Sequence, residues 1–145
     1  MDQPKVISVN ISEKTGERKT PVPRGELKAG IGLDHDAHAG TNRQISLLAM
    51  ESIEKMHRKG LDVKPGDFAE NLTTKGIDLL SLPIGAVLAI GDSIVLRITQ
   101  IGKECHDRCN IYYLAGDCVM PREGIFAEVL RGGPIAPGDD IQVVE

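Results

Sequence analysis

The sequence predicts a mainly-β fold, a closed or strongly bent β-barrel with one main helix and short helical additions. The 145 residues include 16 glycines and eight prolines, which are typical of many turns and short strands. Several short β-branched runs occur along the chain, and only one stretch has a sustained helical period. No linker divides the chain, so we expect residues 1–145 to form a single domain.

The predicted strands are short apolar or β-branched runs bounded by Gly, Pro or Asp. The clearest is 93–101, in which Ile94, Leu96 and Ile98 alternate with a second, largely apolar set. Two apolar faces are typical of a strand inside a barrel or sandwich. The other predicted strands or extended segments are residues 5–11, 20–23, 68–73, 87–90, 125–130 and 141–144. Residues 43–48 are expected to begin as a strand and then turn helical.

The sequence predicts one main helix, at about 47–59. Apolar residues recur at helical spacing, Ser46 is a plausible N-cap, and Gly60 is the expected stop. We interpret the apolar stripe as core packing. Residues 30–40 are too irregular for a helix, and residues 111–114 are expected to form one short helical turn.

Composition excludes several classes of protein. A net charge of −4 argues against general nucleic-acid binding, and no apolar run approaches the length of a membrane span. The first residues lack the pattern of a signal peptide, which favours a cytoplasmic protein. No Walker loop, GxGxxG, GxSxG or HExxH motif occurs. Aromatic residues make up 3% of the chain, so the core is expected to be aliphatic.

All three cysteines lie between Cys105 and Cys118, which is not the pattern of a disulfide framework. Cys105 follows the strongest predicted strand, and Lys103, His106 and Arg108 are positioned to lower the pKa of its thiol. A thiolate there can accept sulfane sulfur, attack an electrophilic sulfur or bind a soft metal. The alternative is a buried, inert cysteine.

The same segment supports a metal hypothesis. Cys105, His106, Cys109 and Cys118 offer three thiolates and an imidazole, which can complete a four-coordinate zinc site or contribute to iron–sulfur binding. The zinc pattern is incomplete, because no second CxxC or HxxxH pair follows.

A second group of polar residues is Asp34-His35-Asp36-Ala37-His38. In an extended chain, Asp34, Asp36 and His38 share one face and can bind a divalent metal, or His38 can contact a ligand. The alternative is that the aspartates stabilise glycine-rich turns and that His38 is structural.

The third group is residues 68–74, where Asn71, Thr73 and Thr74 offer hydrogen-bonding groups suited to a phosphate or a pterin-like heterocycle. Four cations are candidates for the same anion, although each alone is typical of a solvated surface charge: Arg43, Arg97, Lys103 and Arg108.

These groups, in this order, resemble the MOSC domain, the module at the C-terminus of molybdenum-cofactor sulfurases. The matching text includes GLDHDAHAGTNRQIS, ENLTTKGIDL and the cysteine of IGKEC, and the resemblance covers about residues 5–144. It implies a mainly-β, barrel-like fold and a Cys, here Cys105, that holds sulfane sulfur or molybdenum. The implied binding-pocket residues are His38, Arg43, Gln44, Ser46, Glu70 and Asn71, to which we add Thr73, Lys103 and Arg108.

One position departs from the family pattern. Related chains commonly have Gly immediately before the Asp of this segment, whereas this chain has His35 before Asp36. A side chain there bears on how closely a ligand or the backbone can approach.

The resemblance implies a molybdenum-cofactor-associated sulfur carrier or cofactor-binding protein. It would be supplied by a cysteine desulfurase or another sulfur donor and would serve cofactor assembly or a molybdoenzyme. Larger relatives carry a pyridoxal-phosphate domain, and none is expected in this chain. Two alternatives stay open: a molybdenum-dependent reductase of N-hydroxylated compounds with an electron-donor partner, and a zinc-stabilised binding module without turnover. We expect Cys105, His38, Arg43 and Asn71 to surround one cleft.

Overall fold

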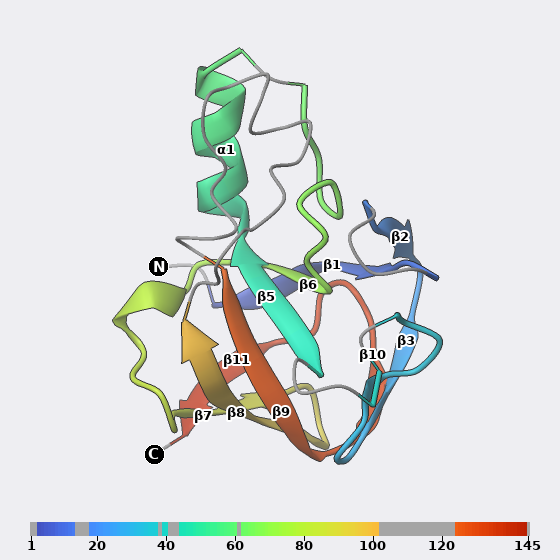
Figure 1. The fold of residues 1–145 in the computed structure, drawn as a ribbon. Coiled ribbons are helices and arrows are strands. Elements are labelled where there is room, and N and C mark those ends of the chain that lie inside the picture. The colour runs from blue at the N-terminus through green and yellow to red at the C-terminus, as the bar shows by residue number, and fades with distance from the viewer. Residues whose placement is uncertain are drawn as a thin grey trace.

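Strands dominate the described part of this computed structural model, which has one α-helix (Figure 1). The structure describes residues 3–13, 18–37, 39–40, 44–60, 62–101 and 124–144. The helix α1 is Met50–Arg58, and a 3₁₀ turn covers Leu79–Ser81. The strands are β1 Lys5–Ile11, β2 Thr20–Val22, β3 Gly25–Lys28, β4 Gly32–Leu33, β5 Ile45–Ala49, β6 Leu72–Lys75, β7 Val87–Ile90, β8 Ile94–Ile101, β9 Ile125–Arg131, β10 Gly133–Ile135 and β11 Ile141–Val144.

Eight of these strands form one sheet in the order β11-β7-β8-β9-β5-β6-β1-β2, and β10-β3-β4 form a second. Neighbouring strands are antiparallel except β5 and β6, which are parallel. A parallel pair needs a long crossover, and α1 with the loop after it supplies this connection. Ser46 and Asn71 form a buried polar corner where this crossover returns to the sheet.

The two halves of the large sheet meet where β1 contacts the start of β11. Val6 N–H donates to Asp139 O at 2.9 Å, Gly138 N–H to Val6 O at 2.7 Å, and Ile141 N–H to Pro4 O at 2.8 Å. An isolated bridge pairs Lys5 with Asp140, without a continuous ladder. The mainly-β class is therefore confirmed, whereas closure into a barrel stays a prediction.

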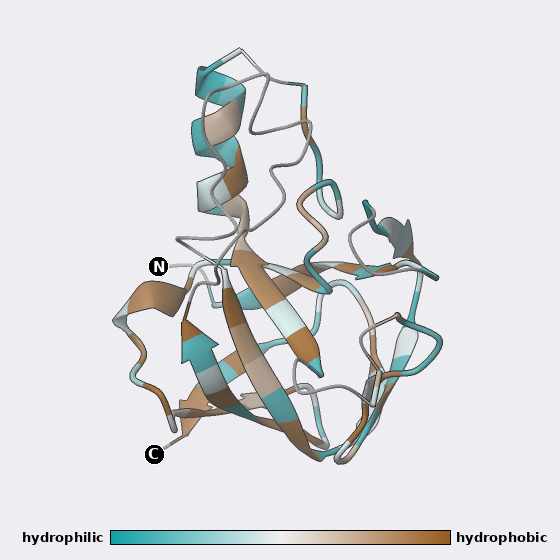
Figure 2. Ribbon diagram, viewed as in Figure 1, coloured by the Kyte–Doolittle hydropathy of each residue, from teal (hydrophilic) through white to brown (hydrophobic). Residues whose placement is uncertain are grey.

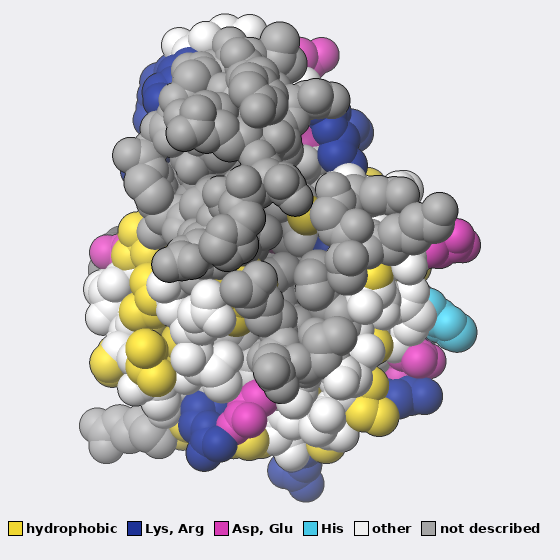
Figure 3. All heavy atoms as spheres, in the orientation of Figure 1, with side chains coloured by type: hydrophobic (Ala, Val, Ile, Leu, Met, Phe, Trp, Pro, Cys, Tyr) yellow, Lys and Arg dark blue, Asp and Glu magenta, His cyan; other side chains and the backbone are white. Residues whose placement is uncertain are grey.

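The larger core cluster is aliphatic, as the composition predicts. One cluster lies along the inner faces of the strands, and Figure 2 shows hydrophobic residues along β5, β8 and β9. A second, smaller cluster joins α1 to the sheet and contains Leu48, Ile53, Met56, Val63, Phe68 and Phe126. Alternation along β5 explains the division, because Ile45 and Leu47 point into the first cluster and Leu48 into the second. Figure 3 shows exposed hydrophobic side chains on the flank occupied by residues 77–86, which include Leu80 and Ile84.

The predicted helix exists, but its start was wrong. Residues 47–49 belong to β5, and the N-cap is Ala49 rather than Ser46. Pairing of β5 with β9 and β6 overrides the helical period of these residues, because both flanks of Leu47 are hydrogen-bonded in the sheet. Gly60 ends the helix as expected, at φ 92°, and its N–H donates to His57 O.

Two strand predictions also need correction. The strand expected at 68–73 begins at Leu72, because residues 68–71 form the loop that enters it. In β8 only the face of Ile94, Leu96 and Ile98 is buried, while Arg97 and Thr99 are exposed. The strands β1, β7, β9 and β11 lie where the sequence predicts them, and residues 20–22 form the expected edge strand. The turn expected at 111–114 lies outside the described residues.

Candidate functional site

A buried polar corner forms where the crossover after α1 enters β6 beside β5. Asn71 Oδ1 accepts hydrogen bonds from Ser46 N–H at 3.0 Å and from the Ser46 hydroxyl at 3.3 Å. Asn71 N–H lies 3.0 Å from Ser46 Oγ and 3.1 Å from Ser46 O. Both residues are almost completely inaccessible to solvent. Buried polar groups need partners, and these two residues supply them to each other.

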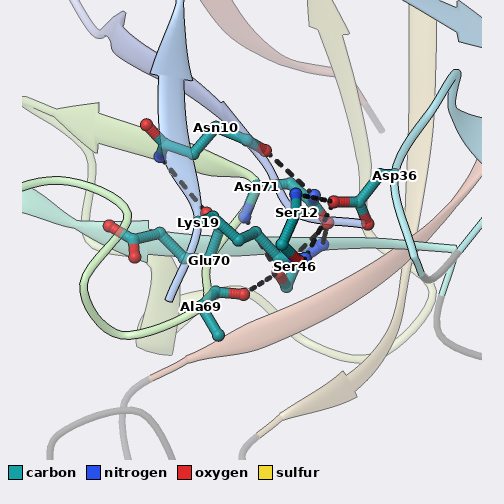
Figure 4. Close-up of polar contacts among 8 residues, drawn as sticks. All are labelled: Asn10, Ser12, Lys19, Asp36, Ser46, Ala69, Glu70 and Asn71. Carbon is teal, nitrogen blue, oxygen red and sulfur yellow. Dashed lines mark hydrogen bonds and ion pairs between the residues drawn. The ribbon is translucent and has the colours of Figure 1, made fainter. Parts of the chain in front are cut away.

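Asn10 of β1 also forms hydrogen bonds with Asn71 of this corner (Figure 4). Its N–H donates to Asn71 O at 2.7 Å, and its carbonyl accepts from Asn71 Nδ2 at 3.2 Å. Its own amide donates to Glu70 O and to Thr73 Oγ1, each at 3.2 Å, and accepts from the Ser8 hydroxyl at 2.6 Å. The side-chain amide of Asn10 therefore spans β1, β6 and the loop before β6.

Glu70 is the titratable group of the corner. Its side chain is fully buried, Oε2 accepts a hydrogen bond from the Thr73 hydroxyl at 2.8 Å, and Oε1 has no partner among the described residues. Burial raises the pKa of Glu70 to about 7, against the opposing effects of the Gly66 backbone and the Thr73 hydroxyl. Near neutral pH this carboxyl is therefore divided between its neutral and charged forms.

A buried ion pair lies next to the corner. Lys19 Nζ is 2.8 Å from Asp36 Oδ1 and 3.0 Å from Ser12 Oγ, and neither charged side chain is exposed. Ser12 N–H also donates to Asp36 Oδ1 at 3.0 Å. The backbone joins the two units, because Lys19 N–H donates to Gly66 O at 2.7 Å. The segment that contains Asp36 is thus tied to the loop that carries Glu70.

Two non-glycine residues near these groups have left-handed backbone. Ala69, directly before Glu70, has φ 65°, and His35, directly before Asp36, has φ 69°. Such a conformation costs an ordinary residue about 1–3 kcal/mol, so surrounding contacts must hold it. At His35 it explains the departure from the family pattern: glycine adopts this φ freely, and histidine fits because its side chain is 85% exposed.

The structure brings together Ser46, Glu70, Asn71 and Thr73 of the predicted site residues. Gln44 lies nearby at the start of β5, where its side-chain oxygen accepts from Val129 N–H at 3.0 Å. Arg97 forms an ion pair with Glu128 on the sheet surface, and Thr74 Oγ1 is buried without a partner in the described part of the chain. The other predicted residues lie outside the described ranges: His38, Arg43, Lys103, Cys105, His106, Arg108, Cys109 and Cys118.

Asp34 does not share a metal site with Asp36 in the described residues. Asp34 Oδ2 lies 3.4 Å from Lys28 Nζ and 3.5 Å from the imidazole of His35, whereas Asp36 is buried against Lys19. Within the described ranges no three His, Cys, Asp or Glu side chains form a group able to hold a metal ion. The described helices include none long and apolar enough to cross a membrane.

Sequence reasoning missed Asn10, Ser12 and Lys19. Each lies in or next to a short β segment where a polar residue is ordinarily read as solvent-exposed. Ser8 and Asn10 share a face of β1 with the apolar Val6, but nothing local in the sequence pointed to the partners of Asn10. Lys19 had no local signal, since its partner Asp36 is 17 residues away.

A concavity of about 780 Å³ lies elsewhere, between the turns at 91–93 and 134–140. Its polar lining includes Arg24, Asp92, Asp139 and Gln142, and none of the predicted site residues contributes to it.

Comparison with known proteins relates the chain to one family. The sequence model of the MOSC domain matches residues 34–142. The structure is similar to the YuaD protein of Bacillus subtilis, with a TM-score of 0.81, 19% identity and coverage of 98% of this chain and 96% of that one. It is also similar to YiiM of Geobacillus stearothermophilus, with a TM-score of 0.72, 19% identity and coverage of 98% and 75%.

YiiM of Escherichia coli gives a TM-score of 0.69 at 20% identity, with coverage of 99% of this chain and 71% of that one. No curated protein matches the chain. At such identities the likeness between structures concerns the fold alone.

Proposed function

Because the chain belongs to the MOSC domain family, we propose that it carries sulfane sulfur on Cys105 in the service of the molybdenum cofactor. The family match is the observation that carries this proposal, since it spans 34–142 and so includes both Cys105 and the corner of Ser46 and Asn71. The scaffold around these residues supports it.

Strands β8 and β9 precede and follow the segment of the sequence that contains Cys105. Ile101 ends β8 and Ile125 begins β9, and the two are Cα partners in the sheet. The connection that contains Cys105 therefore begins and ends at adjacent positions of one sheet end. Four residues of chain keep the Cys105 Cα within about 14 Å of the Ile101 Cα.

The same row of the sheet leads to the polar corner. Ile125 pairs with Leu47 of β5, and Leu47 pairs with Leu72 of β6, which directly follows Asn71. Three strand spacings of about 4.8 Å separate Ile101 from Leu72 along this row.

The proposed sulfur transfer is a thiol–persulfide exchange. The Cys105 thiolate attacks the terminal sulfur of a donor persulfide and forms a new S–S bond. The bond between that sulfur and the donor cysteine breaks, and the donor thiolate leaves with the electron pair. Lys103, His106 and Arg108 are the cationic groups that favour the attacking thiolate.

The residue chemistry of this chain fits the cofactor. Thiolate is a soft ligand suited to a soft metal, and Arg43, Lys103 and Arg108 are cations suited to the terminal phosphate. When bound, the cofactor supplies the metal centre that receives or ligates sulfur. The side chains of Ser46 and Asn71 already bond each other, so we assign them to holding the pocket wall.

Sulfur loading tests the proposal. Purified protein incubated with a cysteine desulfurase and cysteine should gain one sulfur atom, detected as a persulfide by intact-protein mass spectrometry. Cys105→Ser should abolish the gain with an unchanged circular dichroism spectrum, because a hydroxyl cannot hold sulfane sulfur. Cys118→Ser is the matched control and should change the rate of loading more than its extent. Equal loading of Cys105→Ser and wild type would refute the assignment of Cys105.

A further inference from the structure

The loop 62–69 follows α1 in the chain and leads into the polar corner before β6. Val63 and Phe68 pack against Ile53 and Met56 of α1 in the second hydrophobic cluster. At its other end the loop leads directly into Glu70, through the left-handed Ala69. The fold thus anchors the loop at an apolar end and at a polar end.

The polar end depends on a carboxyl whose hydrogen bonding is incomplete. Thr73 satisfies Glu70 Oε2, and Oε1 is buried without a partner in the part of the chain that the structure describes. An unpaired oxygen on a neutral carboxyl costs far less than one on a buried carboxylate, because a buried charge loses its hydration. We propose that Glu70 is a pH-dependent latch, which holds the loop 62–69 closed when neutral and releases it when ionised.

The charged side chains that the structure describes around Glu70 do not offset its ionisation. Lys19, from the segment whose backbone bonds Gly66, directs its ammonium to Asp36. Asp67 of the loop forms an ion pair with Lys64, and its Oδ2 lies 3.8 Å from Arg18 Nη1. Glu70 takes part in no ion pair among the described residues. The backbone of Gly66 and the Thr73 hydroxyl favour its charged form, but burial outweighs them. The charged form therefore gains hydration when the loop opens.

The direction of the pH effect follows from linkage. The pKa of Glu70 is raised to about 7 in the closed form and returns toward 4.5 when the loop exposes it. Closure is then fully supported below about pH 4.5 and is lost as the pH rises toward 7, above which the effect levels off. The opening equilibrium constant should increase by about tenfold or more between pH 5 and pH 7.

Hydrogen–deuterium exchange tests this latch without reference to sulfur chemistry, so its outcome is independent of the proposed function. Exchange is measured at pH 5, 6, 7 and 8 and divided by the intrinsic rate at each pH. Amides of residues 63–69 should lose protection up to pH 7, while amides of β8 and β9 keep theirs. Glu70→Gln, which cannot ionise, should remove the pH dependence, whereas Glu128→Gln on the sheet surface should preserve it.

Two outcomes would overturn the latch. One is pH-independent protection of residues 63–69 in the wild-type protein, and the other is an unchanged pH dependence in Glu70→Gln. If Glu70→Gln does not fold, the pH dependence of amide protection in the wild-type loop, compared with that in β8, still tests the latch.

Discussion

Lys19 and Asp36 form an ion pair shielded from solvent on both sides, next to the corner of Ser46 and Asn71. Desolvation makes such a pair costly to form and more costly to break, because removal of one charge leaves the other without compensation. The Asp36 carboxylate also accepts the Ser12 N–H. We interpret the pair as the tie that holds the segment before His38 against β1.

Substitution at Lys19 tests this tie. Lys19→Met should lower the free energy of unfolding by about 3–5 kcal/mol, because it leaves the buried Asp36 carboxylate without its ammonium. Lys5→Met, which removes the exposed pair with Asp140, is the matched control and should cost less than about 1 kcal/mol. Urea denaturation measures both. Equal decreases in the free energy of unfolding of the two variants would mean that burial does not make loss of the Lys19–Asp36 pair more costly.

The residues of the site were predictable where their roles follow from local sequence. Glu70, Asn71 and Thr73 belong to one short motif, and Ser46 belongs to a second, so a resemblance was sufficient to find them. Asn10 and Lys19 act on partners about 60 and 17 residues away, and only the folded chain reveals them. The incomplete hydrogen bonding of Glu70 is likewise a property of packing, invisible in sequence.

At the scale of elements, the start of α1 shows how the sheet limits the helix. Ala49 is the N-cap, with extended backbone and without a side-chain hydrogen bond to the first turn. The expected cap, Ser46, instead bonds Asn71 across the β5–β6 pair. The helix therefore begins without the side-chain acceptor that usually stabilises a first turn.

The lack of a side-chain acceptor at the N-cap predicts a stabilising substitution. Ala49→Ser should raise the free energy of unfolding by about 0.5–1 kcal/mol, because its hydroxyl can accept an N–H of the first turn. Ala49 borders a concavity of about 430 Å³, which leaves room for the added oxygen. Ala86→Ser, at a half-buried position away from any helix start, is the control and should give no gain. If Ala49→Ser raises the free energy of unfolding no more than the control does, the first turn needs no side-chain cap.

The elements themselves were largely predictable. Strand β8 was found because its residues alternate with a period of two, and β1 was found because it is a β-branched run. Strands β3, β4 and β10 were missed because they have two to four residues and contain Gly or Pro. The boundary between β5 and α1 was misplaced because the apolar residues 47–49 satisfy both periods.

At the scale of the whole molecule, the mainly-β class follows from turn-rich composition and short strands. The order of the strands does not, because it depends on pairings such as β5 with β9 and β1 with β6 that are distant in sequence. These pairings bring the end of β8, where the Cys105 connection begins, onto the row of β5 and β6 that carries the polar corner. This arrangement supports the proposed carrier function, which the family match carries.

The central claim is that a metal-independent β scaffold presents Cys105 as a reactive thiol. Its most direct test is the alkylation rate of each cysteine, measured by peptide mass spectrometry after exhaustive chelation. We expect the chelated protein to keep its circular dichroism spectrum and Cys105 to react faster than Cys109 and Cys118, because a carrier thiol must be accessible and partly ionised. Unfolding on chelation, with none of the three cysteines labelled beforehand, would contradict this and identify the cluster as a zinc site.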